Sequence, residues 1–314
     1  MALKQLYMSI ENSRWGIIYC PKEGKTGSQK HWDAIRKYLK EKEVHYDFVQ
    51  SEDKESVERL AAMLATNGYT TIVVVGGDAA LYRALNGLLT VDLLQLSQIS
   101  LGVIPYGWAN DFARFWGLTE DDYKKAIDAI LLHRIRKVDI GYCQTDKAVR
   151  RYFLNCVNIG LIANIMKIKH KTQRFWGMRS LSFFSSMFLL LFHRMEHFMH
   201  VKVNQDDIQK KVMTMCVGNS WGYGQTPSSV PYNGWLDVSI VSHPELTQML
   251  EGLWMLIWGR FLNHKNVKAY RTKKIHVLER NKSCVSLDGA VWECDSDALE
   301  IGILPEYLNF IIPS

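Results

Sequence analysis

The first part of the chain alternates short apolar runs with longer segments in which apolar residues recur at helical spacing. Runs rich in β-branched residues predict strands, and the segments between them predict helices. The predicted strands are 14–20, 44–49, 70–75 and 99–104, and the predicted helices are 29–42, one after Ser51, and 81–89. Glu52, Asp53 and Glu55 fall in the first turn of the helix after Ser51, where acidic residues favour a helix start. Strands that alternate with helices predict an α/β domain with a parallel sheet.

After Lys137 the pattern changes to longer predicted strands in which apolar and polar residues alternate, which is more typical of antiparallel sheet. The predicted strands are 138–143, 152–158, 201–203, 212–217, 236–241 and 275–278. A second, β-rich domain is the simplest interpretation. Two stripes at helical spacing interrupt it: Leu181, Phe184, Phe188 and Leu191, then Leu250, Leu253, Trp254, Ile257 and Phe261. Each stripe predicts either a core-facing helix or a face that touches lipid.

The composition fits a protein with a substantial core, because 47% of its 314 residues are hydrophobic and 22% are charged. Polar residues interrupt the apolar stretches of the first 15 residues, which argues against a secretory signal, so we expect a cytoplasmic protein. The strongest apolar run, 181–192, is shorter than the roughly 20 residues that span a bilayer. The cysteines are scattered rather than paired, which predicts reduced, buried thiols.

Basic residues concentrate in two stretches. Residues 161–200 hold six Lys and Arg against Glu196 alone, and 260–280 hold seven against Glu279 alone. Such stretches are solvated faces or surfaces for phosphates, an anionic membrane or nucleic acid. No recognisable nucleic-acid reading motif accompanies them, so we expect no nucleic-acid partner.

Two glycine-containing turns follow two of the predicted strands. Gly76, Gly77 and Asp78 follow the strand at 70–75, and Gly107 follows the strand at 99–104. Since adjacent parallel strands present their loops to one crevice, we expect both turns at a common site. The glycines allow close approach of a phosphate, and Asp78 is placed to hold a metal or receive a proton. Asn110 and Asp111 stand where a helix begins, so they are candidates for capping as well as for binding.

At this point the sequence resembles the catalytic-domain family of diacylglycerol kinases, which includes bacterial lipid kinases and sphingosine kinases. The resemblance rests on motifs in a fixed order: YCPKEGKTG (19–27), VVVGGDAALYRALNGLL (73–89), IPYGWANDFAR (104–114), VDIGYC (138–143), FLNCVNIGL (153–161), NGWLDV (233–238), SLDGA (286–290) and ILPEYLNFIIP (303–313). It implies an α/β nucleotide domain, 1–137 with 303–314, and a β-sandwich domain at 138–302 that receives lipid. It also implies transfer of the γ-phosphoryl group of ATP, with Mg²⁺, to a lipid hydroxyl at the cleft between them.

By the same resemblance, the nucleotide-binding residues are Gly76, Gly77, Asp78, Ala79, Ala80, Gly107, Trp108, Asn110 and Asp111, with Asp78 also facing the metal of Mg-ATP. Several of these positions depart from the family pattern. Ala79 and Ala80 replace a glycine and a threonine, and a Cβ at Ala79 costs about 1–2 kcal/mol if that residue needs a positive φ. Trp108 replaces a threonine, where an indole either stacks on adenine or fills its pocket.

Charge changes accompany these departures. Arg83 stands where an acidic residue is common, a difference of two charge units near the site. Cys20 and Glu23 stand where asparagine and serine are usual, and a carboxylate there would repel phosphate. Asn233 stands where an aspartate often coordinates a structural magnesium, and a neutral amide is a weaker ligand for that cation.

The proton acceptor is also affected. In the bacterial lipid kinases it is the Glu of an Asp-Gly-Glu turn, which aligns with Asp288, Gly289 and Ala290. Losing a general base typically costs ~10²- to 10⁴-fold in rate. The resemblance to the sphingosine-kinase branch implies that Asp78 acts as the base, with Asp288 or Glu293 as candidates to assist.

Two functions remain open from the sequence. The first is ATP-dependent phosphorylation of a diacylglycerol-like lipid with weakened turnover. The second is a catalytically inactive pseudokinase that binds nucleotide, lipid or an anionic membrane surface. Either one predicts a lipid or membrane partner, peripheral attachment at the inner membrane face, and a possible homodimer.

Overall fold

The computed structural model describes residues 14–22, 28–53, 55–107, 110–176, 197–221, 226, 228–242 and 266–313. The chain divides into two compact units, which we treat separately. Unit 1 is residues 1–138 with 306–314, and unit 2 is residues 139–305.

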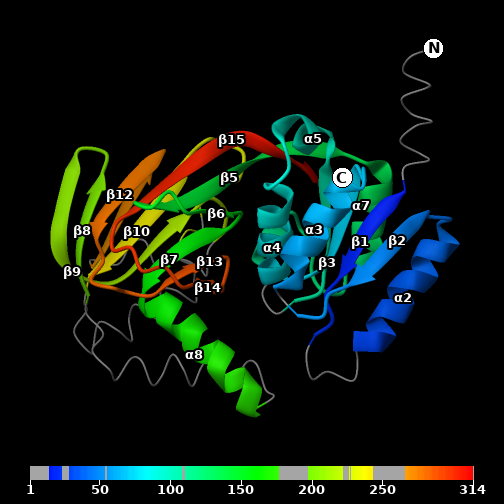
Figure 1. Ribbon diagram of the computed structural model, residues 1–314, viewed down its shortest axis with the longest axis horizontal. Coiled ribbons are helices and arrows are strands. Elements are labelled where there is room, and N and C mark those ends of the chain that lie inside the picture. Colours follow the sequence, from blue (N-terminus) through cyan, green and yellow to red (C-terminus); the bar gives the residue numbers. More distant parts are fainter. Residues whose placement is uncertain are drawn as a thin grey trace. The chain divides into compact units, whose positions relative to one another are not determined.

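Unit 1 is built on a parallel sheet in the order β2–β1–β3–β4–β15 (Figure 1). Its strands are β1 (Trp15–Tyr19), β2 (Tyr46–Gln50), β3 (Thr71–Gly76), β4 (Ser100–Pro105) and the end of β15 (Leu299–Ile311). Every residue of β1, β3 and β4 is buried, because helices cover both faces of a parallel sheet. The glycine-containing turns follow β3 and β4, which are neighbours in the sheet.

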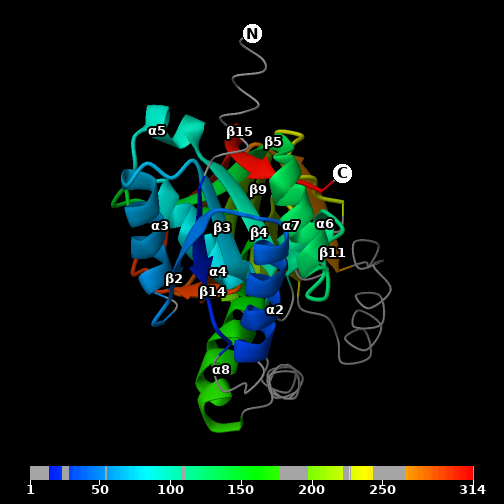
Figure 2. The same cartoon turned by 90° about the vertical axis from the view of Figure 1, so that its right-hand side faces the viewer.

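The helices of unit 1 lie on the two sides of this sheet, with α3 and α4 on one side and α2 and α7 on the other (Figure 2). The helices are α2 (Ser28–Glu41), α3 (Ser56–Thr66), α4 (Asp78–Leu88), α5 (Leu93–Gln98), α6 (Asp111–Phe115) and α7 (Tyr123–Leu132). In α2, Trp32, Ile35 and Leu39 recur at helical spacing and are buried, which explains why this segment is an amphipathic helix.

Unit 2 is β-rich and antiparallel. Its strands are β5 (Ile135–Thr145), β6 (Arg150–Phe153), β7 (Cys156–Gly160), β8 (His197–Val203), β9 (Asp206–Gly218), β10 (Leu236–Ser242), β11 (Val267–Thr272), β12 (Lys274–Glu279), β13 (Val285–Leu287), β14 (Ala290–Trp292) and the first part of β15. They run β14–β13–β7–β9–β8–β12–β15, with β10 between β9 and β11 and with β5 between β15 and β6. One helix, α8 (Leu161–Trp176), packs on β7, β13, β14 and β9.

The predicted class, an α/β unit followed by a β-rich unit, is confirmed. Two details were wrong. The predicted strand 152–158 is two strands, β6 and β7, because the chain bends at Leu154 and Asn155. The helix predicted after Ser51 begins only at Ser56, and Asp53 precedes it, with its carboxylate accepting a hydrogen bond from Ser56 N at 2.7 Å.

Other expectations have mixed outcomes. All six cysteines are free thiols, but Cys20, Cys284 and Cys294 are only partly buried. The two apolar stripes, Glu23, Trp108 and most of the basic stretch at 161–200 lie outside the residues whose side chains are described. Most of the stretch at 260–280 is described, and in it Arg271 pairs with Asp237 and Lys274 with Glu300. Among the helices in the described ranges, none is both long and apolar enough to cross a bilayer.

Candidate functional site

The structure brings the two glycine turns of unit 1 into direct contact. Tyr106 N donates a hydrogen bond to Gly76 O at 2.8 Å, which ties the end of β4 to the end of β3. A methyl group added at Gly107 would lie 2.4 Å from Gly77 Cα, and one added at Gly77 would lie 2.8 Å from Gly107 Cα. Both turns therefore need glycine for this close approach, and they form one continuous backbone surface at the carboxyl edge of the sheet.

Asp78 joins these turns through its side chain. One carboxylate oxygen accepts from Asp111 N at 2.8 Å, and the other accepts from Phe112 N at 3.1 Å. These amides belong to the first turn of α6, so an aspartate at the start of α4 caps the neighbouring helix. Proton or metal chemistry at Asp78 competes with these hydrogen bonds.

Asn110 occupies the N-cap position of α6 but does not cap it with its side chain. Its backbone is left-handed, with φ 52°, and its Nδ2 donates to Gly107 O at 3.2 Å. Among the described residues, its buried Oδ1 accepts no hydrogen bond. A methyl group at Gly107 would lie 2.5 Å from this oxygen, so an open acceptor lies beside the glycine contact. That environment suits a ligand that brings a hydrogen-bond donor.

The two alanines that follow Asp78 are accommodated without backbone strain. Ala79 and Ala80 lie within α4, and neither is among the described residues with positive φ, so the cost considered for a Cβ at Ala79 does not arise. A methyl group at Gly76 would lie 2.8 Å from Ala80 Cβ, so Ala80 packs closely against the turn. What the chain lacks here is the threonine hydroxyl.

The charge reversal at Arg83 is compensated within unit 1. The guanidinium lies 3.1 Å from Glu55 Oε1 and 3.7 Å from Glu58 Oε2, both at the start of α3. Its positive charge is therefore engaged between α3 and α4. Cys20, beside the same turns, is a poor nucleophile, because burial raises the pKa of its thiol to about 11.

Sequence reasoning missed a cluster at the end of β1. Lys22 pairs with Glu120, and its Nζ lies 4.2 Å from the centroid of the Tyr106 ring. His31 stacks on that ring at 4.2 Å, and burial lowers the pKa of this histidine. No local signal could have found the cluster, because Lys22 and Glu120 are separated by 98 positions.

In unit 2, Asp288 holds a loop together. Asp288 and Gly289, with φ 47° and 80°, form the two-residue turn between β13 and β14. The Asp288 carboxylate is buried and accepts from the amides of Leu154, Asn155 and Cys156 at 2.7, 2.9 and 2.9 Å. These are the residues at which the chain bends between β6 and β7.

Ala290 begins β14 and is buried, so the position that carries the base in the resembled family holds a methyl group. Glu293 follows β14 and is exposed. The three residues of this turn thus provide one carboxylate, and the backbone amides already bind it.

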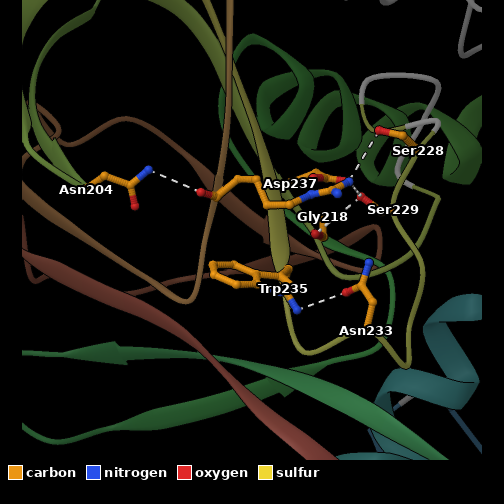
Figure 3. A network of polar contacts seen from close by, with 8 residues as sticks. Asn204, Gly218, Ser228, Ser229, Asn233, Trp235 and Asp237 are labelled. Atoms are coloured by element: carbon orange, nitrogen blue, oxygen red, sulfur yellow. Dashed lines mark hydrogen bonds and ion pairs between the residues drawn. The ribbon is translucent and has the colours of Figure 1, made fainter.

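The polar side chains near Asn233 are bonded to backbone amides or to one another, an arrangement that does not fit a magnesium ion (Figure 3). Asn233 Oδ1 accepts from Trp235 N at 2.9 Å. Asp237 pairs with Arg271, whose Nε and Nη2 lie 2.7 and 3.2 Å from its two oxygens. Ser228 and Ser229 also donate to this carboxylate, at 3.3 and 3.1 Å. Within the described ranges, no cluster of three or more His, Cys, Asp or Glu side chains is placed to hold a metal.

Comparison with known proteins identifies both units. Residues 14–143 match the model of the diacylglycerol kinase catalytic domain, and residues 155–312 match that of the YegS C-terminal NAD kinase beta sandwich-like domain. The chain is 23% identical over 278 residues to a diacylglycerol kinase of Bacillus subtilis, covering 87% of this chain and 88% of that protein.

A diacylglycerol kinase of Mycobacterium tuberculosis is 26% identical over 235 residues, 72% of each chain. Among solved structures, a diacylglycerol kinase from Bacillus anthracis superposes with a TM-score of 0.67 at 17% identity, covering 96% of this chain and 97% of that one. At that identity the structural likeness establishes the fold.

Proposed function

Because the chain belongs to the diacylglycerol kinase catalytic-domain family, we propose that it transfers the γ-phosphoryl group of ATP to a diacylglycerol-like lipid hydroxyl, with weakened turnover. The observation that carries this proposal is the contact between the Gly77 and Gly107 turns, with the open acceptor of Asn110 beside it. A backbone surface of this kind, next to the start of α4, suits the phosphates of a nucleotide.

In this proposal, several residues of unit 1 contribute to ATP binding in different ways. Gly76 and Gly77 let the phosphates approach the backbone, and the first turn of α4, with Ala79 and Ala80, directs its amides toward them. Gly107 and Asn110 form the second side of the site. Asp78 keeps Asp111 and the rest of α6 in register with the first turn.

Magnesium supplies charge neutralisation on the phosphates when it is bound. The described residues offer Asp78 as the only carboxylate in the first glycine turn, and its oxygens bind the α6 amides. We therefore assign the ion to the nucleotide rather than to a cage of protein carboxylates.

Turnover is weakened because the turn at Ala290 lacks a proton acceptor. A missing base typically lowers the rate ~10²- to 10⁴-fold. Phosphoryl transfer through a loose transition state, however, depends more on positioning of the reactants than on deprotonation of the acceptor hydroxyl. Activity is thus reduced and not necessarily lost.

The test is phosphate transfer from Mg-ATP to diacylglycerol in mixed micelles. We expect turnover at least ~100-fold below that of a relative with the glutamate, and a gain of at least tenfold in Ala290→Glu. Ala269→Glu places the same charge on exposed β11 and serves as the matched control. Brisk turnover by the unaltered chain would contradict the weakened turnover, and a loss of kcat at saturating Mg-ATP in Asp78→Asn would then identify Asp78 as a sufficient base.

A second function, nucleotide or lipid binding without turnover, is favoured by the engagement of Asp78 and Asp288 in backbone hydrogen bonds. It predicts that Mg-ATP raises the unfolding temperature while no lipid is phosphorylated, even by Ala290→Glu. Under either function the lipid lies in a membrane, so we further propose peripheral attachment at the inner membrane face. Sedimentation with vesicles of anionic phospholipid tests that attachment, and light scattering tests the expected homodimer.

A further inference from the structure

The ammonium group of Lys22 is buried in a way that demands an anion. The side chain is 5% exposed, and its Nζ lies over the Tyr106 ring and bonds to Glu120. A buried ammonium loses its hydration, so it is retained only with an anionic partner. Glu120 fills that role here, but its side chain is 40% exposed. The two partners are therefore unequal: Glu120 can turn into water at little cost, whereas Lys22 cannot.

This pair adjoins the glycine turns. Cys20 N donates to Val75 O at 2.9 Å, and a methyl group at Gly76 would lie 3.4 Å from Cys20 Cβ. Lys22 follows two residues later, and the ring under its ammonium belongs to Tyr106, whose amide bonds to Gly76 O. A short path of contacts thus connects the ammonium to the backbone surface assigned to phosphate.

Glu120 and a bound phosphate would compete for the same ammonium group of Lys22, and the neighbouring groups do not replace either of them in that role. His31 stacks on Tyr106, and burial lowers the pKa of His31, which disfavours a second positive charge beside Lys22. Asp121 is exposed and lies within electrostatic range of the same histidine. It carries the same negative charge as its neighbour Glu120, and it therefore provides a matched control.

We propose that Glu120 is an internal competitor of the nucleotide: it holds Lys22 when the site is empty, and a phosphate oxygen of the incoming nucleotide displaces it. This inference rests on the proposed function, because it requires a nucleoside triphosphate at the glycine turns. Exchange of a carboxylate for a phosphate keeps the ammonium paired throughout. Glu120 then lowers nucleotide affinity, and Lys22 contributes to phosphate recognition.

The experiment is equilibrium binding of Mg-ATP and of inorganic tripolyphosphate to the full chain, with thermal unfolding of every variant. Glu120→Gln removes the rival charge and keeps the side-chain shape, so both ligands should bind about tenfold tighter, the factor that 1.4 kcal/mol represents. Asp121→Asn removes a neighbouring charge of the same sign and should change either affinity less than twofold. Lys22→Met should weaken binding about tenfold, and Lys22→Met with Glu120→Gln should match Lys22→Met alone.

The outcomes separate the two proposals. Unchanged or weaker binding in Glu120→Gln, in a chain that binds ATP, would show that the pair is a structural tie and would overturn this inference alone. Equal gains in Glu120→Gln and Asp121→Asn would also overturn it, since they would reflect net charge. If neither the unaltered chain nor Glu120→Gln binds ATP or tripolyphosphate, both the competitor and the proposed function fail.

Discussion

Asp78 in unit 1 and Asp288 in unit 2 are the two aspartates that the family resemblance makes candidates for catalysis, and both use their carboxylates to hold backbone amides. Asp288 is 2% exposed and binds three amides of the loop between β6 and β7. Asp78 binds two amides of α6 and lies next to Asn110, whose Oδ1 is open. Asp288 therefore stabilises a buried turn, whereas Asp78 stabilises the start of α6, which forms the rim of the candidate nucleotide site.

The comparison shows that both motifs retain the aspartate whose carboxylate holds the backbone. Ala290 stands where the family resemblance implies a glutamate, one residue beyond the Asp288–Gly289 turn, and the turn itself is a regular two-residue connection between β13 and β14. Ala79 and Ala80 stand where the resemblance implies a glycine and a threonine, and α4 begins at Asp78. The residues that depart from the family pattern at these two turns are therefore ones whose side chains the backbone does not require.

The largest effect should come from Asp288→Ala. We expect a loss of about 3–5 kcal/mol of unfolding free energy, because three buried amides each lose an acceptor worth ~1–3 kcal/mol. Chemical denaturation measures it. Asp297→Ala, which removes a single bond to the exposed Lys282 amide, is the control and should cost under about 1 kcal/mol. Equal losses in the two variants would contradict the interior role of Asp288.

Asp78→Ala should have an intermediate effect. Loss of a helix cap typically costs about 0.5–2 kcal/mol, and the release of α6 should also weaken ATP binding. Asp92→Ala removes the cap of α5, whose carboxylate accepts from Gln95 N at 2.8 Å. That control should lose comparable stability while it leaves ATP affinity unchanged. If both variants keep normal ATP affinity, Asp78 does not shape the rim.

The smallest effect should come from Arg83→Ala. Its partner Glu55 is 68% exposed, and exposed ion pairs contribute about 0–1 kcal/mol. Because the Arg83 charge is engaged by Glu55 and Glu58, we expect less than a twofold change in ATP affinity by calorimetry. A large drop in ATP affinity would mean that Arg83 contacts the phosphates. Arg83→Glu, which places three acids together, should cost more stability than Arg83→Ala.

The sequence predicted the glycine turns because local patterns determine them. A fully apolar strand, two glycines and a helix start define the region of β3 and α4, and parallel neighbours share an edge. The break within 152–158 could not be predicted, because it depends on the Asp288 carboxylate more than 130 positions away. The pairing of Lys22 with Glu120 could not be predicted either, because the two residues are far apart in the sequence and each one alone is typical of an exposed charged residue.

The division of β15 between the units has a consequence for synthesis on the ribosome. Its residues 299–302 pair with β12 in unit 2, whereas Asn309 and Phe310 pair with β4 in unit 1. Phe310 is fully buried, and its ring centroid lies 4.9 Å from that of Phe112 in α6. The sheet of unit 1 therefore stays incomplete until β15 is translated, because β15 is the second neighbour of β4. Until then the nascent chain carries an unpaired strand edge, the kind of surface that chaperones protect.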